Sequence, residues 1–162
     1  MELVQRINIP IPPTDVWAAL NNPEILKDCI PGCEAFVASG EDMYDIVVQA
    51  KVGPVKARFT GEVALADMDP PHAYTLNGSG KGGVAGFAKG GAHIRLVAID
   101  DGTLMTYQVK AAVGGKLAQL GARLVMGAAR KMADDFFTRF VRTLSNDPDL
   151  VITLETVEEG EQ

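Results

Sequence analysis

GGKLAQLGARLVMGAARKMADDFFTRFVRTL, residues 114–144, is the stretch of sequence that decides the fold. Apolar residues recur in it every three or four positions, which is typical of one face of a helix. The predicted apolar stripe consists of Leu117, Leu120, Leu124, Ala128, Met132, Phe136, Phe140 and Leu144. At about 1.5 Å per residue the stretch predicts one helix of roughly 40–45 Å, long enough to lie across a small sheet. Its first half is slim, with Gly121 and Gly127, and its second half carries Phe136, Phe137 and Phe140.

Composition favours one globular domain followed by a tail. The chain has 162 residues, of which 47% are hydrophobic and 22% charged, which is ordinary for a folded domain. We expect a domain over residues 1–145 and an acidic tail over residues 146–162. No apolar run reaches the ~18–20 residues of a membrane span, and the start, MELVQRINIP, lacks the features of a signal peptide. The sequence therefore predicts a cytoplasmic protein.

The net charge of −6 comes from the tail. Residues 147–162 hold six of the 21 acids and no base, so the rest of the chain has 15 acids and 15 bases. A neutral domain with an acidic tail is a poor binder of nucleic acid, which requires clustered lysine and arginine. We therefore expect no nucleic-acid partner.

Alternating segments upstream predict an antiparallel sheet of about seven strands. Period-two alternation gives one covered and one solvated face, which indicates antiparallel pairing. The expected strands are Leu3–Ile9, Ala35–Ser39, Met43–Val52, Val55–Ala66, Ala73–Gly80, Ala88–Ile99 and Leu104–Val113. Two short helices follow the first strand, one over Thr14–Leu20 and one that begins at Asn22-Pro23-Glu24. The predicted fold class is α+β, with the sheet wrapped around the long C-terminal helix that must bury its stripe.

The turns of such a sheet alternate between its two ends, and the charges separate with them. Turns 39–42, 67–72 and 100–102 hold all the turn acids, whereas turns 53–54, 78–86 and 113–116 are glycine-rich and hold none. We call the second set the acid-free end. Its predicted rim, which would face a partner or a membrane, consists of Lys51, Lys56, Lys81, Lys89 and Lys116. The alternative is that loops are simply polar and that glycines make turns.

Small inward residues near the acid-free end predict a cavity against the slim half of the helix. Cores pack at crystal-like density, so small residues that face small residues either collapse together or leave a hollow. The alternative is a close approach of sheet and helix. The predicted cavity residues are Val48, Ala50, Val52, Ala57, Phe59, Gly61, Leu76, Gly78, Phe87, Tyr107, Val109, Ala111, Val113, Leu117, Leu120, Gly121, Leu124 and Ala128.

The sequence offers no catalytic or metal-binding constellation. His72 and His93 are far apart in this topology, and Cys29 and Cys33 are too few for a zinc site; we interpret the two thiols as buried. The run GSGKGGVAGFAKGG at 78–91 lacks the order of a phosphate loop. We therefore expect a protein that is not an enzyme, with no catalytic residue, no metal and no covalent cofactor.

Four short motifs stand out along the chain: WAALNNP at 17–23, CIPGCE at 29–34, VGPVKARFTG at 52–61 and GSGKGG at 78–83. Together they resemble the CoxG family, a family of carbon monoxide dehydrogenase accessory proteins within the START/Bet v 1-like helix-grip superfamily, and the resemblance covers roughly residues 1–145. It implies a helix gripped by an antiparallel sheet around a lipid-like cavity. It also implies an accessory role beside a molybdenum hydroxylase of the carbon monoxide dehydrogenase type, at the inner face of the cytoplasmic membrane and its quinone pool.

Three functions follow as hypotheses. The first is a non-catalytic carrier of a hydrophobic molecule, such as a quinone or another lipid, that couples the hydroxylase subunits to the membrane. The second is a ligand-free assembly factor for the same enzyme class. The third is a cyclase-like enzyme, for which Tyr107 and Tyr44 are the inward polar candidates. Some family members carry a C-terminal membrane anchor, whereas this tail is acidic; its alternation at Leu150, Ile152 and Leu154 predicts a strand on its own sheet or on that of a partner in a dimer.

Overall fold

The computed structural model describes the backbone of residues 1–160 and the side chains of residues 1–157. It contains eight strands, four α-helices and one 3-10 turn. In chain order these are β1 (Glu2–Ile9), α1 (Pro13–Leu20), α2 (Pro23–Cys29), β2 (Cys33–Gly40), β3 (Met43–Val52), β4 (Val55–Asp69), β5 (Ala73–Lys81), η1 (Gly83–Ala85), β6 (Phe87–Ile99), β7 (Gly102–Gly114), α3 (Lys116–Gln119), α4 (Ala122–Ser145) and β8 (Leu154–Gly160).

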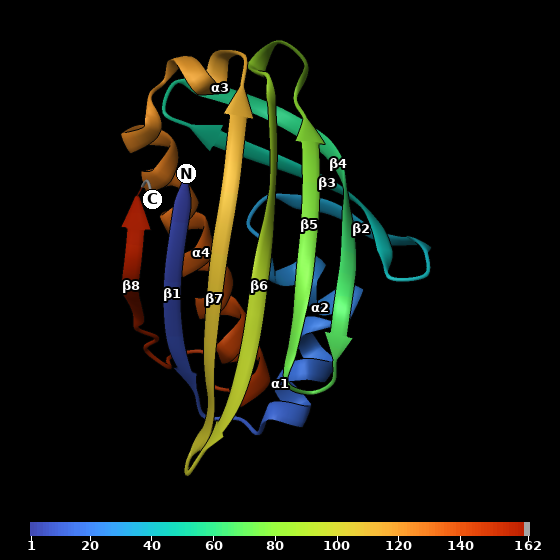
Figure 1. The fold of residues 1–162 in the computed structure, drawn as a ribbon, viewed down its shortest axis with the longest axis vertical. Coiled ribbons are helices and arrows are strands. Elements are labelled where there is room, and N and C mark those ends of the chain that lie inside the picture. Colours follow the sequence, from blue (N-terminus) through green and yellow to red (C-terminus); the bar gives the residue numbers. More distant parts are fainter. Residues whose placement is uncertain (161–162) are drawn as a thin grey trace.

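One antiparallel sheet holds all the strands, in the order β2-β3-β4-β5-β6-β7-β1-β8. It curves around α4, while α1 and α2 lie under one end (Figure 1). The predicted α+β helix-grip fold is therefore confirmed. All seven expected strands are present, and the eighth, β8, comes from the tail.

Local sequence explains the two short helices. Pro13 occupies the first position of α1, where its missing N–H is not needed and its fixed φ suits a helix. Asn22 caps α2, because its Oδ1 accepts a hydrogen bond from the Glu24 N–H at 3.0 Å. This cap satisfies a backbone donor that would otherwise have no intrahelical partner.

The prediction of one continuous helix from the start of the 114–144 stretch is wrong. Strand β7 runs to Gly114, the single turn α3 follows, and a break at Gly121 precedes α4. Gly121 has φ +91°, a conformation that glycine adopts without the penalty of a Cβ. The continuous part is α4, whose 24 residues span about 36 Å.

The predicted apolar stripe on the helix is also partly wrong. Steps of four residues drift by about 40° each on a helix of 3.6 residues per turn, so a long chain of such steps leaves the buried face. Leu124 and Met132 accordingly stay 41% and 37% exposed. The buried residues of α4 are Val125, Met126, Phe137, Phe140 and Val141.

The bulky half of α4 fills the main core. Phe140 and Val141 are fully buried, and the Phe137 ring stacks on Tyr107 of β7 with centroids 5.1 Å apart. Ile7 of β1 and Val16 of α1 belong to the same cluster. The core is therefore concentrated where α1, the C-terminal half of α4 and the middle of the sheet meet.

The turn parity predicted from strand order is confirmed. Antiparallel pairing places the β3–β4 turn, the β5–β6 turn with η1, and the entry to α3 at one end. These segments lie together near the top of Figure 1, where the turns are glycine-rich and carry no acid. The sorting of lysines and acids between the two ends is thus a property of the fold.

The tail docks on its own sheet. Strand β8 pairs antiparallel with β1, and the Arg6 guanidinium lies 2.8 Å from the Glu155 carboxylate. Leu150, Ile152 and Leu154 pack against the core cluster. This settles the choice of sheet within one chain; the dimer stays a prediction. Across residues 1–160, no helix has the length and apolar character needed to cross a bilayer.

Candidate ligand-binding cavity

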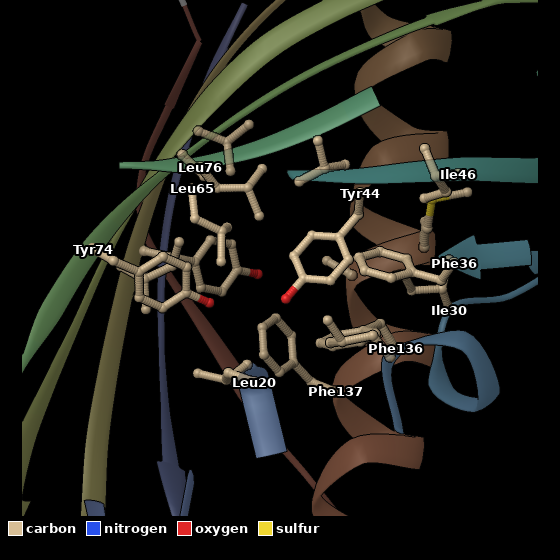
Figure 2. A pocket seen from close by; sticks show the side chains of 18 of the residues that line it. Leu20, Ile30, Phe36, Tyr44, Ile46, Leu65, Tyr74, Leu76, Phe136 and Phe137 are labelled. Atoms are coloured by element: carbon tan, nitrogen blue, oxygen red, sulfur yellow. The ribbon is translucent and has the colours of Figure 1, made fainter. Parts of the chain in front are cut away.

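A cavity of about 450 Å³ lies between the sheet and α4, with α1 and α2 completing its wall. Strands β2 to β7 contribute the curved side and α4 the other (Figure 2). The lining residues are Leu20, Leu26, Ile30, Phe36, Tyr44, Ile46, Val48, Val63, Leu65, Tyr74, Leu76, Ala92, Ile94, Met105, Tyr107, Val109, Ala129, Met132, Ala133, Phe136 and Phe137.

The wall is almost entirely hydrocarbon. None of these lining side chains carries a charge, and the polar atoms among them are the hydroxyls of Tyr44, Tyr74 and Tyr107. An apolar hollow of this kind favours apolar ligands, because water gains few hydrogen bonds inside it. The position of each hydroxyl then decides how much polarity a ligand meets.

The Tyr107 hydroxyl is already satisfied by the protein. It donates a hydrogen bond to Gln5 Oε1, and Gln5 Nε2 donates to Thr156 Oγ1 at 3.1 Å. Burial raises the pKa of Tyr107, with a smaller contribution from the charge of Asp134. This chain of contacts links the cavity wall through β1 to the tail strand β8.

The hydroxyls of Tyr44 and Tyr74 have no hydrogen-bond partner in the part of the chain that the structure describes. Both point into the middle of the cavity (Figure 2). Tyr74 is 3% exposed and meets Trp17 edge-on, with ring centroids 5.2 Å apart. Burial raises the pKa of Tyr74 and nearby Tyr44 adds to the effect, so the hydroxyl stays protonated and available as a donor.

The cavity reaches the surface beside α4. Among its lining residues, Ala129 and Met132 of α4 are exposed, whereas Tyr74, Tyr107 and Ile94 are buried. The hollow therefore has a shallow end at α4 and a deep end near β5 and α1.

Four of the predicted cavity residues line this cavity: Val48, Leu76, Tyr107 and Val109. The other fourteen do not line it: Ala50, Val52, Ala57, Phe59, Gly61, Gly78, Phe87, Ala111, Val113, Leu117, Leu120, Gly121, Leu124 and Ala128. Part of this set lies where sheet and helix approach closely. A Cβ on Gly53 would stand only 2.7 Å from Leu124 Cδ2.

Some of the strand glycines serve close contacts between strands. A Cβ built on Gly61 would lie 1.8 Å from the Ser79 carbonyl oxygen on β5, and one on Gly90 would lie 2.5 Å from the Lys110 carbonyl oxygen on β7. Real Cβ atoms do not approach a carbonyl oxygen so closely, so only glycine fits at these two positions. Their small size follows from backbone approach within the sheet rather than from space for a ligand.

Several residues of the cavity were not anticipated from the sequence. They include Tyr74, Ala92 and the two alanines Ala129 and Ala133, which lie four residues apart and so share a face of α4. The i, i+4 pair of alanines just before Phe136 and Phe137 was the available signal. It marks a short stretch where the helix presents little volume toward the sheet.

The predicted rim lysines, Lys51, Lys56, Lys81, Lys89 and Lys116, are all exposed and do not line the cavity. They surround the acid-free end, where Val84 is 84% exposed and Phe87 45% exposed. This end is thus a cationic surface with apolar side chains at its tip.

The cysteines and histidines do not assemble a site. Cys29 is buried and Cys33 half-buried, and burial raises the pKa of both thiols. Thr75 Oγ1 and His93 Nδ1 lie 3.4 Å apart. Within the described residues, no three histidine, cysteine or acidic side chains gather closely enough to hold a metal ion.

Comparison with models of known protein families shows to which family the chain belongs. The family model that matches is that of CoxG, a carbon monoxide dehydrogenase subunit, and the match covers residues 6–145. The chain belongs to the CoxG family. None of the curated proteins compared with this CoxG protein matches it.

Solved structures share the fold. A conserved protein from Geobacillus kaustophilus is 33% identical with a TM-score of 0.85, and the match covers 90% of this chain and 96% of that one. The Zhui aromatase/cyclase from Streptomyces sp. R1128 is 12% identical with a TM-score of 0.63, covering 90% and 94%. Protein Ms6760 from Mycobacterium smegmatis is 14% identical with a TM-score of 0.67, covering 90% and 91%. The two distant matches establish the fold alone.

Proposed function

We propose that this CoxG protein is a non-catalytic accessory protein that binds a hydrophobic ligand, such as a quinone or another lipid, between the sheet and α4. In this role it helps to couple a molybdenum hydroxylase of the carbon monoxide dehydrogenase type to the membrane. The observation that carries the proposal is the uncharged cavity of about 450 Å³. Membership of an accessory-subunit family supports the non-catalytic role.

The size of the cavity suits a small organic ligand. Ligand pockets in proteins typically enclose about 300–1,000 Å³ and are lined mainly by apolar side chains with a few polar groups. A cavity of about 450 Å³ accepts a ring system or part of a chain, and the exposed Met132 at its shallow end leaves a route for a longer tail. A lipid-like molecule therefore needs to insert only its head.

The acid-free end supports the second half of the role. Lys51, Lys81 and Lys116 are exposed there beside Val84. A surface with this charge attracts anionic lipid headgroups or an acidic face of a partner enzyme. Docking through it leaves the cavity mouth beside α4 uncovered, so ligand exchange and docking can occur together.

Native mass spectrometry tests ligand binding directly. The protein is analysed as purified, after organic extraction, and after incubation with decylubiquinone. We expect a mass increase that extraction removes and that the quinone restores. Ala133→Trp fills the α4 side of the cavity and should abolish the restored adduct, whereas Val84→Trp, which adds the same side chain at an exposed position, should not. A folded wild-type protein that accepts no apolar molecule contradicts the proposal.

The cationic surface also favours a second function, a ligand-free assembly factor for the same hydroxylase. Pull-down of the hydroxylase with the Ala133→Trp variant separates the two. If the Ala133→Trp variant captures the hydroxylase and the enzyme keeps full activity, the ligand is not needed and the assembly function is supported. If the variant captures the hydroxylase but the enzyme no longer reduces quinone, the carrier function is supported.

A further inference from the structure

We propose that the hydroxyls of Tyr44 and Tyr74 form a two-donor anchor that takes the carbonyl oxygen of a neutral lipid-like ligand, and that this anchor selects such ligands over anionic lipids. The inference rests on the proposed binding function and adds the chemistry of the ligand's head. It assigns a specific polar site inside an otherwise apolar cavity.

The two tyrosines come from separate strands and converge. Tyr44 lies on β3 and Tyr74 on β5, on either side of β4 in the sheet order. Figure 2 shows both hydroxyls directed toward the middle of the cavity, between Leu65 and Phe137. A ligand oxygen placed there meets donors from two sides, and a carbonyl oxygen has two lone pairs with which to accept them.

The two hydroxyls keep their hydrogen-bonding capacity for a guest in the cavity, because neither bonds to another described residue. A hydroxyl that a guest covers without offering an acceptor costs free energy relative to an apolar group of the same shape. Phenylalanine in place of Tyr74 would keep the edge-on contact with Trp17 and avoid that cost. Because Tyr107 in the same wall bonds to Gln5, the protein can satisfy a cavity hydroxyl from its own side chains, and it does not do so for Tyr44 or Tyr74.

The absence of charge in the wall decides which heads are accepted. The described lining residues include no lysine, arginine or histidine, so a carboxylate or phosphate head would lose its hydration without gaining a counter-ion. A neutral carbonyl loses less and gains two donors. The head therefore goes to the deep end near Tyr74, and the tail extends toward Met132 at the surface.

Three probes with the same chain length test the anchor: 2-tetradecanone, tetradecane and tetradecanoate. Each competes with the neutral dye Nile red for the extracted full-length protein at pH 8. For wild type we expect the ketone to bind roughly tenfold more tightly than the alkane, as two modest hydrogen bonds provide, and tetradecanoate to bind more weakly than the ketone. In the double variant Tyr44→Phe/Tyr74→Phe the ketone-to-alkane ratio should fall to one or below, because the carbonyl then leaves water without gaining a donor, while alkane binding is retained.

The alkane serves as the internal control, because its binding reports an intact apolar cavity in each variant. If wild type binds ketone and alkane equally, or if the double variant keeps the wild-type ratio, the anchor is refuted while apolar binding stands. Tightest binding of tetradecanoate also refutes it. If wild type binds none of the probes or the dye, the proposed carrier function itself fails. If the double variant does not fold, the single variants provide the same ratio, and each should lose part of it.

Discussion

We expect Phe140→Ala and Phe136→Ala, made separately, to lower the free energy of unfolding by different amounts, because only Phe136 borders the cavity. The two phenylalanines lie one helical turn apart on α4, with ring centroids 5.5 Å apart. Phe140 is 0% exposed and surrounded by core, whereas Phe136 lines the cavity. The same change in chemistry is therefore made in a filled and in a partly hollow environment.

Removing Phe140 loses a full set of contacts and leaves a new hole. Changes from phenylalanine to alanine in cores cost about 3–5 kcal/mol, and the complete burial of Phe140 places it at the upper end. The Phe136 ring has partner atoms on fewer sides, because a void already adjoins it, and we expect a cost of about 2 kcal/mol. The difference of roughly 2–3 kcal/mol corresponds to more than a tenfold difference in the unfolding equilibrium constant.

Urea unfolding followed by circular dichroism provides the free energies, with slopes compared to confirm two-state behaviour. Phe87→Ala is the matched control, since Phe87 is 45% exposed and should cost under about 1 kcal/mol. Equal losses for Phe136→Ala and Phe140→Ala would refute the reasoning, because they would mean that Phe136 is as tightly packed as the core.

Three further predictions concern single contacts. Tyr107→Phe leaves its buried glutamine acceptor unpaired and should lower unfolding free energy by about 1–3 kcal/mol, which a urea titration checks against wild type. Gly61→Ala forces a Cβ against a carbonyl oxygen, while Gly80→Ala has 3.8 Å of room; thermal melts should show a loss of at least about 2 kcal/mol for the first and under about 1 kcal/mol for the second. The Arg6 guanidinium lowers the pKa of Glu155, so the pair stabilises the fold above the unfolded-state pKa of about 4.3 and that contribution is lost as pH falls through the folded-state value. Melts from pH 6 to pH 3 should fall slightly less for Glu155→Gln than for wild type, and parallel curves would contradict the assignment.

Strand boundaries and topology were predictable because they depend on short-range patterns. Alternation along Met43–Val52 placed β3 at its observed bounds, and strand order alone sorted the turns between the two ends. The break in the helix at Gly121 was not found, because one glycine inside an apolar pattern does not reveal its φ. The extent of β7 to Gly114 similarly depended on pairing with β6.

Most of the residues predicted to line a cavity near the acid-free end lie outside the cavity of about 450 Å³ between the sheet and α4. Small side chains were treated as space, although a glycine such as Gly61 is required by a neighbouring backbone only 1.8 Å from its would-be Cβ. The alanines Ala129 and Ala133 indicate space more reliably, because the backbone of a helix has a constant radius and a small side chain leaves the volume beside it unfilled. Tyr74 was missed for a different reason: nothing in a strand pattern distinguishes a satisfied hydroxyl from an unpaired one.

Side-chain volume along α4 separates the part of the helix that borders the cavity from the part that fills the core. Ala129 and Ala133 face the sheet across the cavity, and one to two turns later Phe137, Phe140 and Val141 fill the interior. Since stability depends on apolar area removed from water and on contacts at close range, the aromatic segment supports the fold while the alanine segment contributes little. The packed aromatic half of α4 therefore accounts for the fold without side chains that fill the cavity beside Ala129 and Ala133.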